Sequence, residues 1–388
     1  MKPIVLKSTL KPRQAALYAF AFLIAAAALP SFASTASNTT ITNTATVAFS
    51  DAGGVPQTAV TATATVTVTL VPSALNISSP PNVPNLPQGT AADLVYTIIG
   101  TANGPDTYSL SAADTVNNLT GTGITFPGGN PITLSATTLA ANAPIGANTI
   151  TVPYDGNAST ATINGLVPGA TIMIGGNPYV IAAAGINKTG SVASNTVVIT
   201  LVTPIAGTAG VAGAVVPERL LVHVNVPSGT VTTGTSGTQI ITLSGTSTTD
   251  PTKTGTQGTP TTVTTIRPTL TVTKQVSTDN GATFTAAGNA TPGTSLIYKI
   301  TASNTGATAA TQVQFTDVVP LFLTYVPGSA RFAQAASTYA AATALTEGSG
   351  GYTFTPATQT ANYNPGGAIG TVAATTGVLI FFFRATIN

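Results

Sequence analysis

The sequence predicts an all-β fold in which tandem β-sandwiches follow an N-terminal β-hairpin. In many short segments, apolar residues alternate with threonine at a period of two, the pattern of a half-exposed strand. Clusters rich in Gly, Pro and Asn separate these segments and predict turns. Only 6% of the residues are charged while 43% are hydrophobic, a composition that argues against disorder.

Residues 1–33 have the features of a secretory signal peptide. Four basic residues between Lys2 and Arg13 precede an apolar run from Ala15 to Leu29, and the small-residue pattern that follows predicts cleavage after Ala33. The run is shorter than the about 20 residues that a helix needs to cross a bilayer. We therefore expect a secreted, extracellular or cell-surface protein with no membrane span in the mature chain.

The composition of the mature chain excludes several functions. Loss of the signal leaves eight basic against ten acidic residues, a net charge of −2, and no basic stripe for nucleic acid. The absence of cysteine excludes disulfides and thiol catalysis. The single histidine, His223, has no second histidine with which to build a metal site or triad. We expect no enzyme activity, no catalytic residue, no metal and no cofactor.

Residues 34–72 predict a long β-hairpin around the turn Asp51-Ala52-Gly53-Gly54. An isolated hairpin is at best marginally stable in water, so we expect this one to lie against another surface. Its predicted apolar face would contribute on the order of 10 kcal/mol gross if it were buried. This candidate donor-strand face comprises Val47, Phe49, Val60, Val66, Val68 and Leu70.

Two sandwiches are predicted after the hairpin. The first spans residues 73–262 and contains a small β insert at about 147–213 with its own short strands. The stretch Pro251 to Thr261 contains no apolar residue other than proline and predicts a linker or long loop. The second sandwich spans residues 268–388, with strands at 270–276, 296–303, 313–317 and 378–387.

The second sandwich resembles a known family. The resemblance rests on three segments within residues 268–332: LTVTKQVS, PGTSLIYKITASNTG and ATQVQFTDVVPLFLTYVPGS. They are similar to the conserved-repeat "domain of unknown function eleven" of bacterial and archaeal surface proteins. The resemblance implies extracellular, immunoglobulin-like modules, and the middle segment is similar to the sandwich modules that accompany such repeats. The fold class that follows is tandem immunoglobulin-like β-sandwiches.

The order of one motif departs from that family. Such repeats usually continue beyond a strand like FFFRATIN into a closing segment of the form I-x-N-T-A-T-V. In this chain the corresponding phrase is ITNTATVAF, from Ile41 to Phe49, near the amino terminus. We infer that the closing hairpin is displaced to the start of the chain.

The C-terminal strand is the candidate acceptor for that hairpin. Val378 to Phe383 is a run of six apolar residues, which would be an aggregation hazard as an unpaired edge. Strand addition would pair this edge and bury the hairpin at once. The predicted acceptor residues are Leu379, Phe381, Phe383 and Ile387.

These features favour a structural function. A hairpin donated to a neighbouring copy makes a head-to-tail contact that repeats without closing. The protein would then be the subunit of an extracellular filament or surface layer, and its partner would be another copy of itself. The alternative is a monomeric cell-surface adhesin, or a glycan-binding or spacer protein, with the hairpin docked in its own chain. Other surface proteins or glycans would then be its partners.

One constellation could carry chemistry. Strand parity places Lys274 and Asp317 on core faces, and pilin-like domains form an intramolecular isopeptide bond between such a lysine and an asparagine beside a carboxylate. Burial favours the neutral, nucleophilic amine. Asn388 is the candidate acceptor, although parity with Phe381 and Phe383 points it outward. The alternative is a plain ion pair between Lys274 and Asp317.

Overall fold

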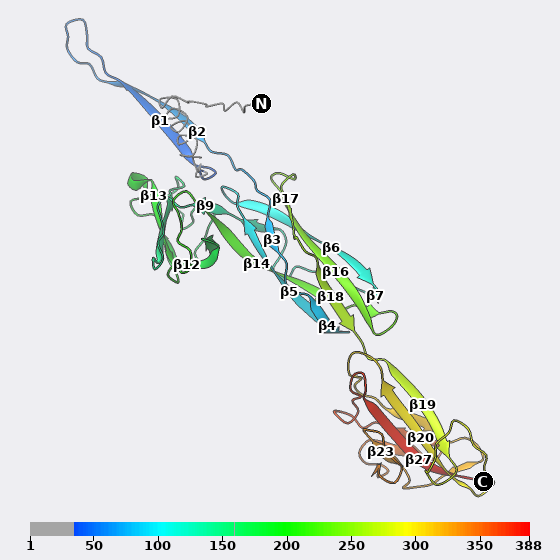
Figure 1. The fold of residues 1–388 in the computed structure, drawn as a ribbon. Helices are drawn as coiled ribbons and strands as arrows, with labels where there is room; N and C mark the ends of the chain where they lie inside the picture. Colours follow the sequence, from blue (N-terminus) through cyan, green and yellow to red (C-terminus); the bar gives the residue numbers. More distant parts are fainter. Residues whose placement is uncertain (1–34, 159) are drawn as a thin grey trace, which may run out of the picture.

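The computed structural model describes residues 35–158 and 160–388, which form an elongated all-β molecule (Figure 1). The hairpin lies at one end, the middle sandwich and its insert follow, and the C-terminal sandwich lies at the other end. The all-β prediction is confirmed, since the described helix α2 (Ser191–Ser194) is a single turn. No helix in the described ranges is both long and apolar enough to span a bilayer. The predicted signal peptide lies outside these ranges.

The N-terminal hairpin forms as the alternation predicts. Strands β1 (Thr40–Val47) and β2 (Val60–Thr67) pair antiparallel, with Ile41 opposite Val66 and Val47 opposite Val60. The predicted turn is closed by Asp51, whose Oδ1 accepts hydrogen bonds from the backbone N–H groups of residues 53 and 55. Gly54 takes a φ of 81°, which glycine adopts without steric cost.

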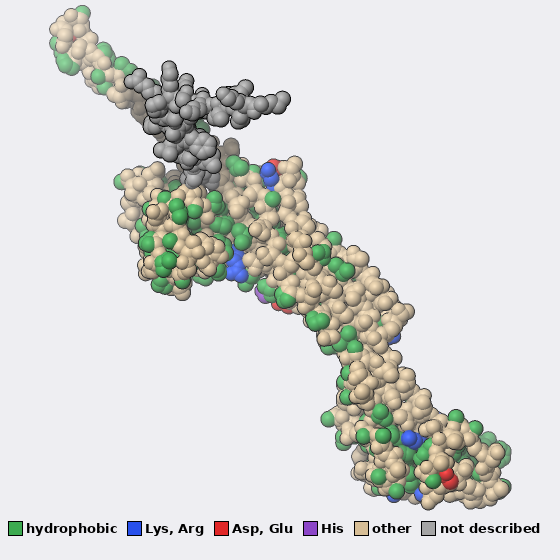
Figure 2. Space-filling model, viewed as in Figure 1, with side chains coloured by type: hydrophobic (Ala, Val, Ile, Leu, Met, Phe, Trp, Pro, Cys, Tyr) green, Lys and Arg blue, Asp and Glu red, His purple; other side chains and the backbone are tan. Residues whose placement is uncertain are grey.

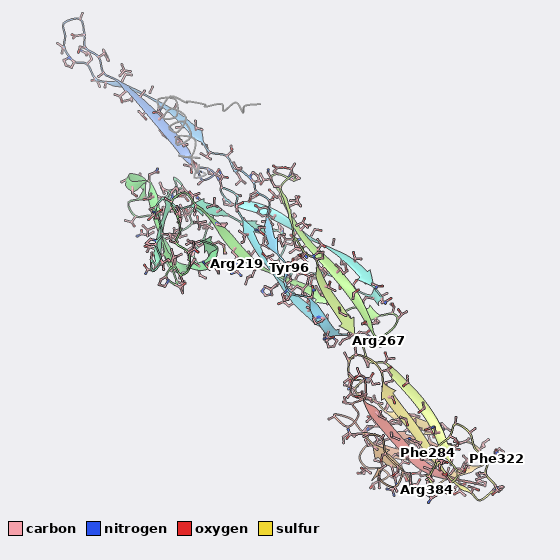
Figure 3. The ribbon with its side chains drawn as sticks, in the orientation of Figure 1. Tyr96, Arg219, Arg267, Phe284, Phe322 and Arg384 are labelled. Carbon is pink, nitrogen blue, oxygen red and sulfur yellow. The ribbon has the colours of Figure 1, made fainter. Side chains whose placement is uncertain are left out.

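The middle domain is a sandwich of two sheets around one apolar core. One sheet contains β3 (Asn76–Ser78), β5 (Ala91–Gly100) and β14 (Val215–Pro227), and β9 (Ala136–Thr138) also pairs with β14. The second contains β4 (Val83–Pro87), β6 (Asp106–Asn117), β8 (Ile132–Leu134), β16 (Ser236–Ser247), β17 (Thr254–Thr256) and β18 (Thr261–Ile266). Strands β7 (Leu119–Thr120) and β15 (Thr230–Val231) form a separate ribbon. Alternate residues of both sheets, including Tyr96, meet in the core (Figure 3).

The predicted insert continues one sheet of this sandwich. Its strands are β10 (Thr149–Pro153), β11 (Thr171–Ile174), β12 (Asn177–Asn187) and β13 (Thr196–Leu201). Strand β11 pairs with β14, and the insert has its own core, which begins at Leu139 and ends at Val216. The insert is therefore a lateral extension of the sandwich with a separate hydrophobic core.

The predicted linker is wrong. Residues 251–261 lie within the middle sandwich, where β17 and β18 both pair with β16. Gln257 is only 4% exposed; its side chain accepts from Leu243 N–H and donates to Ile241 O. Backbone and amide hydrogen bonds hold this stretch in place of apolar side chains. The chain crosses between the two domains at 267–269, where Arg267 is labelled in Figure 3.

The C-terminal sandwich has two sheets of unequal size. The larger one has the order β19 (Leu270–Ser277), β20 (Ser295–Asn304), β27 (Val378–Ile387), β23 (Arg331–Ala333) and β24 (Thr343–Ala344), with β22 (Leu323–Tyr325) also on β27. The smaller one contains β21 (Phe315–Val318), β26 (Thr360–Tyr363) and β25 (Tyr352–Thr355). An aromatic core fills the space between them.

A half-buried carboxyl lies where the insert joins the sandwich. Glu218, the neighbour of the Arg219 labelled in Figure 3, lies on β14 and pairs with both β5 and β11. Its Oε2 accepts from Ser135 N–H at 3.0 Å, and its own N–H donates to Ser135 O at 2.8 Å. Burial raises the pKa of Glu218 to about 7.

This shift predicts that the protein loses stability as the pH rises. The folded state holds the Glu218 proton more tightly than the unfolded chain, so the stabilisation is present at low pH and is lost between the ordinary pKa of 4.5 and about 7. Urea unfolding at pH 4.5 and pH 8 should differ by on the order of 1–2 kcal/mol, allowing for partial solvent screening. Glu218→Gln, which keeps an acceptor oxygen, should remove this difference. The exposed control Glu347→Gln should not, and equal pH dependence in both variants would contradict the assignment.

Candidate functional site

The hairpin projects into solvent. Every residue of β1 and β2 is exposed, and no other strand of the described residues pairs with either. Of the predicted donor face, Val47 (62% exposed), Phe49, Val60 and Val66 (65%) lie fully in solvent. Val68 and Leu70 are half-buried at the base. Among the described residues, β1 and β2 are therefore docked on no other strand, and only the base of the hairpin contacts the middle sandwich.

The register divides the hairpin into two chemically distinct faces. Pairing of Ile41 with Val66, Ala45 with Ala62 and Val47 with Val60 gathers the apolar side chains on one side. Threonines cover the other side, where Thr44 Oγ1 lies 3.1 Å from Thr63 Oγ1. Asn43, opposite Ala64, is the one polar residue on the apolar face. An exposed apolar face of this extent is typical of an interaction surface.

Asn103 fixes the base of the hairpin to the middle sandwich. Its Nδ2 donates to Thr35 O (2.9 Å) and Thr69 O (3.2 Å), and its Oδ1 accepts from Val71 N–H (2.7 Å). Its backbone O accepts from Ser37 N–H at 2.8 Å. A Cβ at the following Gly104 would overlap Ser37 Oγ. Sequence reasoning missed this residue because nothing in the local pattern distinguishes it from a turn asparagine.

The predicted acceptor strand is wrong. Strand β27 is interior, because it pairs with β20 along one edge and with β22 and β23 along the other. Leu379, Phe381 and Phe383 are buried in the core, and Ile387 pairs with Leu323. Phe382 is buried on the opposite face beside Phe284, which Figure 3 labels. The apolar run thus reflects burial of the strand on both faces.

The edge strand that borders the open side of the C-terminal sandwich is β21 of the smaller sheet; β19, β24 and β25 are the other end strands of its two sheets. Strand β21 pairs with β26 on one side, and no described strand pairs with its other side. The three strands of this sheet leave the first half of β19 uncovered, so two of its core-facing apolar side chains are in solvent, whereas Val276 is half-buried. Leu270 is 41% and Val272 is 65% exposed. The C-terminal sandwich is therefore open between β19 and β21.

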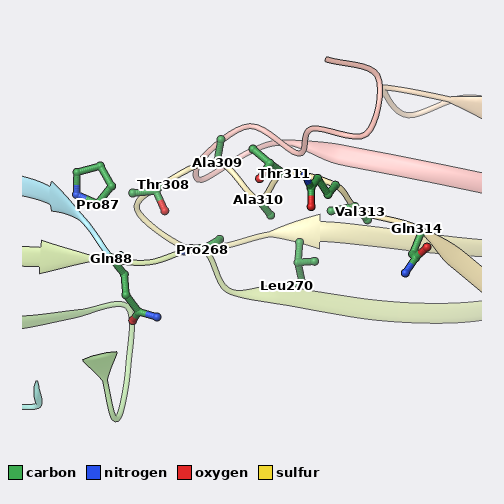
Figure 4. Close-up of a pocket in the computed structure, with 11 residues that line it drawn as sticks. Pro87, Gln88, Pro268, Leu270, Thr308, Ala309, Ala310, Thr311, Val313 and Gln314 are labelled. Atoms are coloured by element: carbon green, nitrogen blue, oxygen red, sulfur yellow. The ribbon is translucent and has the colours of Figure 1, made fainter. Parts of the chain in front are cut away.

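A groove marks this opening. It has a volume of about 850 Å³ and lies between Leu270 on one side and the segment Thr308–Gln314 on the other (Figure 4). Pro87 and Gln88 of the middle domain close one end. Beyond the far end of β21, Leu321 and Phe322 are 84% and 79% exposed, and Phe322 O accepts a hydrogen bond from Asn388 N–H at 2.9 Å; Figure 3 labels Phe322.

Two of the three predicted isopeptide residues come together beside this groove. Lys274 Nζ lies 2.7 Å from Asp317 Oδ1 and 5.0 Å from the centre of the Tyr298 ring. Asp317 is 9% exposed, and its Oδ2 is buried without a hydrogen-bond partner.

Asn388 does not join this pair. Lys274 is in register with Ile300 and, through it, with Phe381, so Asn388 lies seven residues further along β27, about 23 Å away at 3.3 Å per residue. Its side chain accepts from Thr324 Oγ1 at 2.6 Å. The predicted intramolecular bond to Asn388 is wrong, and an ion pair between Lys274 and Asp317 is present.

Other chemistry-bearing residues are dispersed. His223 Nδ1 lies 2.8 Å from Asp93 Oδ2, and both side chains are about half exposed. Within residues 35–158 and 160–388, no group of three or more His, Asp or Glu side chains is placed to hold a metal ion.

Comparisons with known proteins do not assign a family. No family model and no curated protein matches the chain. Among solved structures, the C-terminal domain of the Streptococcus agalactiae antigen I/II polypeptide BspA aligns over 81% of this chain and 91% of its own, with 11% identity and a TM-score of 0.33. The corresponding domain of Streptococcus pyogenes AspA aligns over 82% and 92%, with 10% identity and a TM-score of 0.34. Neither resemblance is close enough to indicate function.

Asn103→Ala should release the base of the hairpin without unfolding the sandwich. The loss of three side-chain hydrogen bonds costs about 1–3 kcal/mol locally, because the partners are partly buried. Hydrogen exchange of the amides of Ser37 and Val71 should accelerate by about 10- to 100-fold, while that of core strand β5 should not change. Asn117→Ala, at an exposed asparagine on β6, is the matched control. Equal exchange rates in the two variants would exclude this role for Asn103.

Proposed function

We propose that the protein is a secreted structural subunit of an extracellular filament or surface layer. Each subunit donates its N-terminal hairpin to the open side of the C-terminal sandwich of a neighbouring copy, between β19 and β21, with the groove beside Leu270 at one end. The observation that carries this proposal is the exposure of Leu270 and Val272, two core-facing residues that a further pair of strands beside β21 would cover. In this proposal the chain has no enzymatic role and needs no cofactor.

The two surfaces are complementary in size and chemistry. Strands β1, β2 and β19 are each eight residues long. The donor presents small aliphatic side chains, and the groove lacks apolar cover over Leu270 and Val272. Charge does not oppose the contact, since Asp51 at the tip is the one charged residue between 35 and 72, and charges are sparse on the face shown in Figure 2. Main-chain hydrogen bonds along β21 would add directionality.

The arrangement of the two surfaces favours a filament over a closed dimer. The hairpin and the open sandwich lie at opposite ends of an elongated molecule (Figure 1). Donation from one end to the other is a heterologous contact, which propagates when it does not close into a ring. The resemblance of residues 268–332 to the domain of unknown function eleven, from surface proteins, supports an extracellular or cell-surface location for this assembly.

Charges on the apolar face of the hairpin should abolish assembly. The double variant Val47→Asp and Val66→Asp should remain monomeric, because docking would bury two unpaired carboxylates. The matched control Thr46→Asp and Thr65→Asp alters the adjacent residues of the other face and should still form filaments. Both pairs are exposed in the subunit, so the fold should be unchanged. Negative-stain electron microscopy and analytical ultracentrifugation of the mature chain are the measurements.

Two results would overturn the proposal. Filaments from the Val47/Val66 variant would show that the hairpin is not the donor. A monodisperse single subunit from the intact mature chain at high concentration would favour a monomeric adhesin or spacer.

Mixing a donor-defective and an acceptor-defective chain should give dimers only. Val272→Asp, at an exposed core-facing position of β19, should block the acceptor, whereas Thr273→Asp on the opposite face should not. In a mixture of the Val272→Asp chain and the Val47/Val66 variant, the first chain keeps a functional hairpin and the second keeps a functional acceptor site. A 1:1 dimer by light scattering is expected. Filaments from the Val272→Asp chain alone would exclude this groove.

A further inference from the structure

Asn43 is unusual among the donor residues. It is the one polar side chain on a face otherwise formed by Ile41, Ala45, Val47, Val60, Ala62, Ala64 and Val66. Burial of that face in a neighbour would bury the amide as well, and a buried amide needs a polar partner. The partner it meets depends on how β1 aligns with β21.

The free edge of β21 is defined by its hydrogen bonds to β26. Val319 N–H donates to Gln359 O at 2.8 Å, and hydrogen-bonded residues alternate along an antiparallel strand. Residues 315, 317 and 319 therefore bond to the β26 side and direct their side chains to the core. Thr316 and Val318 present their backbone groups to the outer edge.

The free edge of β1 has the matching parity. Val68 N–H donates to Thr39 O at 2.9 Å, so the odd residues of β1 bond to β2 and the even residues, including Thr42 and Thr44, face outward along the edge. Antiparallel pairing of β1 with β21 thus joins even residues to even residues. The same pairing turns the apolar face of the hairpin toward the exposed side of β19.

The ends of the groove select one register. Antiparallel to β21, the hairpin of a neighbour enters from the end at Leu321 and Phe322 and points its tip toward the middle domain. When Asn43 lies opposite Asp317, Ala45 lies opposite Phe315, the first residue of β21, and the tip of the hairpin extends toward the segment Thr308–Gln314 that lines the groove. At the other end Ile41 lies opposite Val319, and the exposed apolar residues beyond it meet the base of the hairpin. This register pairs β1 with the whole of β21 and directs the tip of the hairpin to the groove.

Asn43 then lies beside the pair formed by Lys274 and Asp317. The buried Oδ2 of Asp317 has no hydrogen-bond partner among the described residues of the subunit, and Asn43 Nδ2 can supply one. Lys274, whose side chain is 45% exposed in the free subunit, would be covered by the incoming hairpin. The three residues form the lysine, carboxylate and asparagine set of an isopeptide bond, with the asparagine contributed by the neighbour.

We propose that Lys274 of one subunit and Asn43 of the next form an isopeptide bond, so that the filament is covalently linked. This inference rests on the proposed function, because only hairpin donation brings the residues together. Loss of water on docking favours proton transfer from the Lys274 ammonium to Asp317.

Each step of the reaction has an identified donor and acceptor. The free Nζ amine attacks Cγ of Asn43, and a C–N bond forms as the Cγ–Nδ2 bond breaks. The Nζ proton and the proton held by Asp317 leave with Nδ2 as ammonium, which restores the carboxylate. Each junction lowers the summed mass of the two chains by about 17 Da, the mass of ammonia.

The test is denaturing electrophoresis and intact-mass spectrometry of filaments formed by the full mature chain. We expect a ladder of covalent multimers that resists boiling in detergent, together with a linked peptide containing Lys274 and Asn43. Asn43→Ala and Lys274→Arg should each abolish the ladder, and negative-stain electron microscopy of the same samples distinguishes loss of the bond from loss of the filament. Thr42→Ala, adjacent to Asn43 but on the outer face, should retain it.

The outcomes separate the two proposals. Filaments that dissociate fully into monomers would overturn the covalent bond and leave hairpin donation intact. A ladder that persists in Asn43→Ala would assign the bond to other residues and also overturn the inference. Absence of filaments from the unmodified chain would overturn both proposals.

Discussion

A sheet edge in a folded protein must be paired or protected, and the proposed assembly of this chain depends on one edge, that of β21, beside which core-facing side chains of β19 lie in solvent. The smaller sheet of the C-terminal sandwich has three strands, which is too few to cover the five-strand path beneath it. Strand β21 is left with an open edge, and Leu270 and Val272 are left without cover. Open edges of this kind are a liability that natural proteins usually block with charges, prolines or bulges. Here the edge is flanked by apolar residues and a groove, features that favour occupation by a strand.

The hairpin at the opposite end has the complementary deficiency. Its strands pair only with each other, so its outer edges and its apolar face have no partner among the described strands, and two strands alone are marginal in water. Asn103 holds its base against the middle sandwich, so the hairpin leaves the domain in a defined direction. Pre-organisation of this kind lowers the entropy that docking must overcome. In a chain without cysteine, such docking would supply the cohesion that disulfides provide elsewhere.

Much of the fold could be predicted because period-two alternation reports directly which face of a strand is buried. The hairpin faces, its Asp51 turn and the main strands of both sandwiches were predicted from it. Alternation does not predict where a strand lies within its sheet. A run of apolar residues such as Val378 to Phe383 fits an exposed edge strand and an interior strand equally well. The loops that cover Phe382 from outside show that this strand is interior.

The stretch around Gln257 was also missed. It contains no apolar side chain other than proline, and its place in the sandwich depends on hydrogen bonds that no local pattern reveals. Strand parity predicted the contact between Lys274 and Asp317. The distance of Asn388 from this pair could be found only from the order and register of the strands in the folded sheet.

The central claim is that β1 of one subunit pairs with β21 of the next. The chain contains no cysteine, so a single engineered pair tests it directly. Thr44 and Thr316 would be opposite one another at about 5.5 Å between Cα atoms, a separation that a disulfide bridges. Oxidation of filaments formed by the double variant Thr44→Cys and Thr316→Cys should give disulfides between subunits. The double variant Thr63→Cys and Thr316→Cys should give none, because position 63 is on β2, one strand further from β21. Efficient linkage through Thr63 and none through Thr44 would contradict the account.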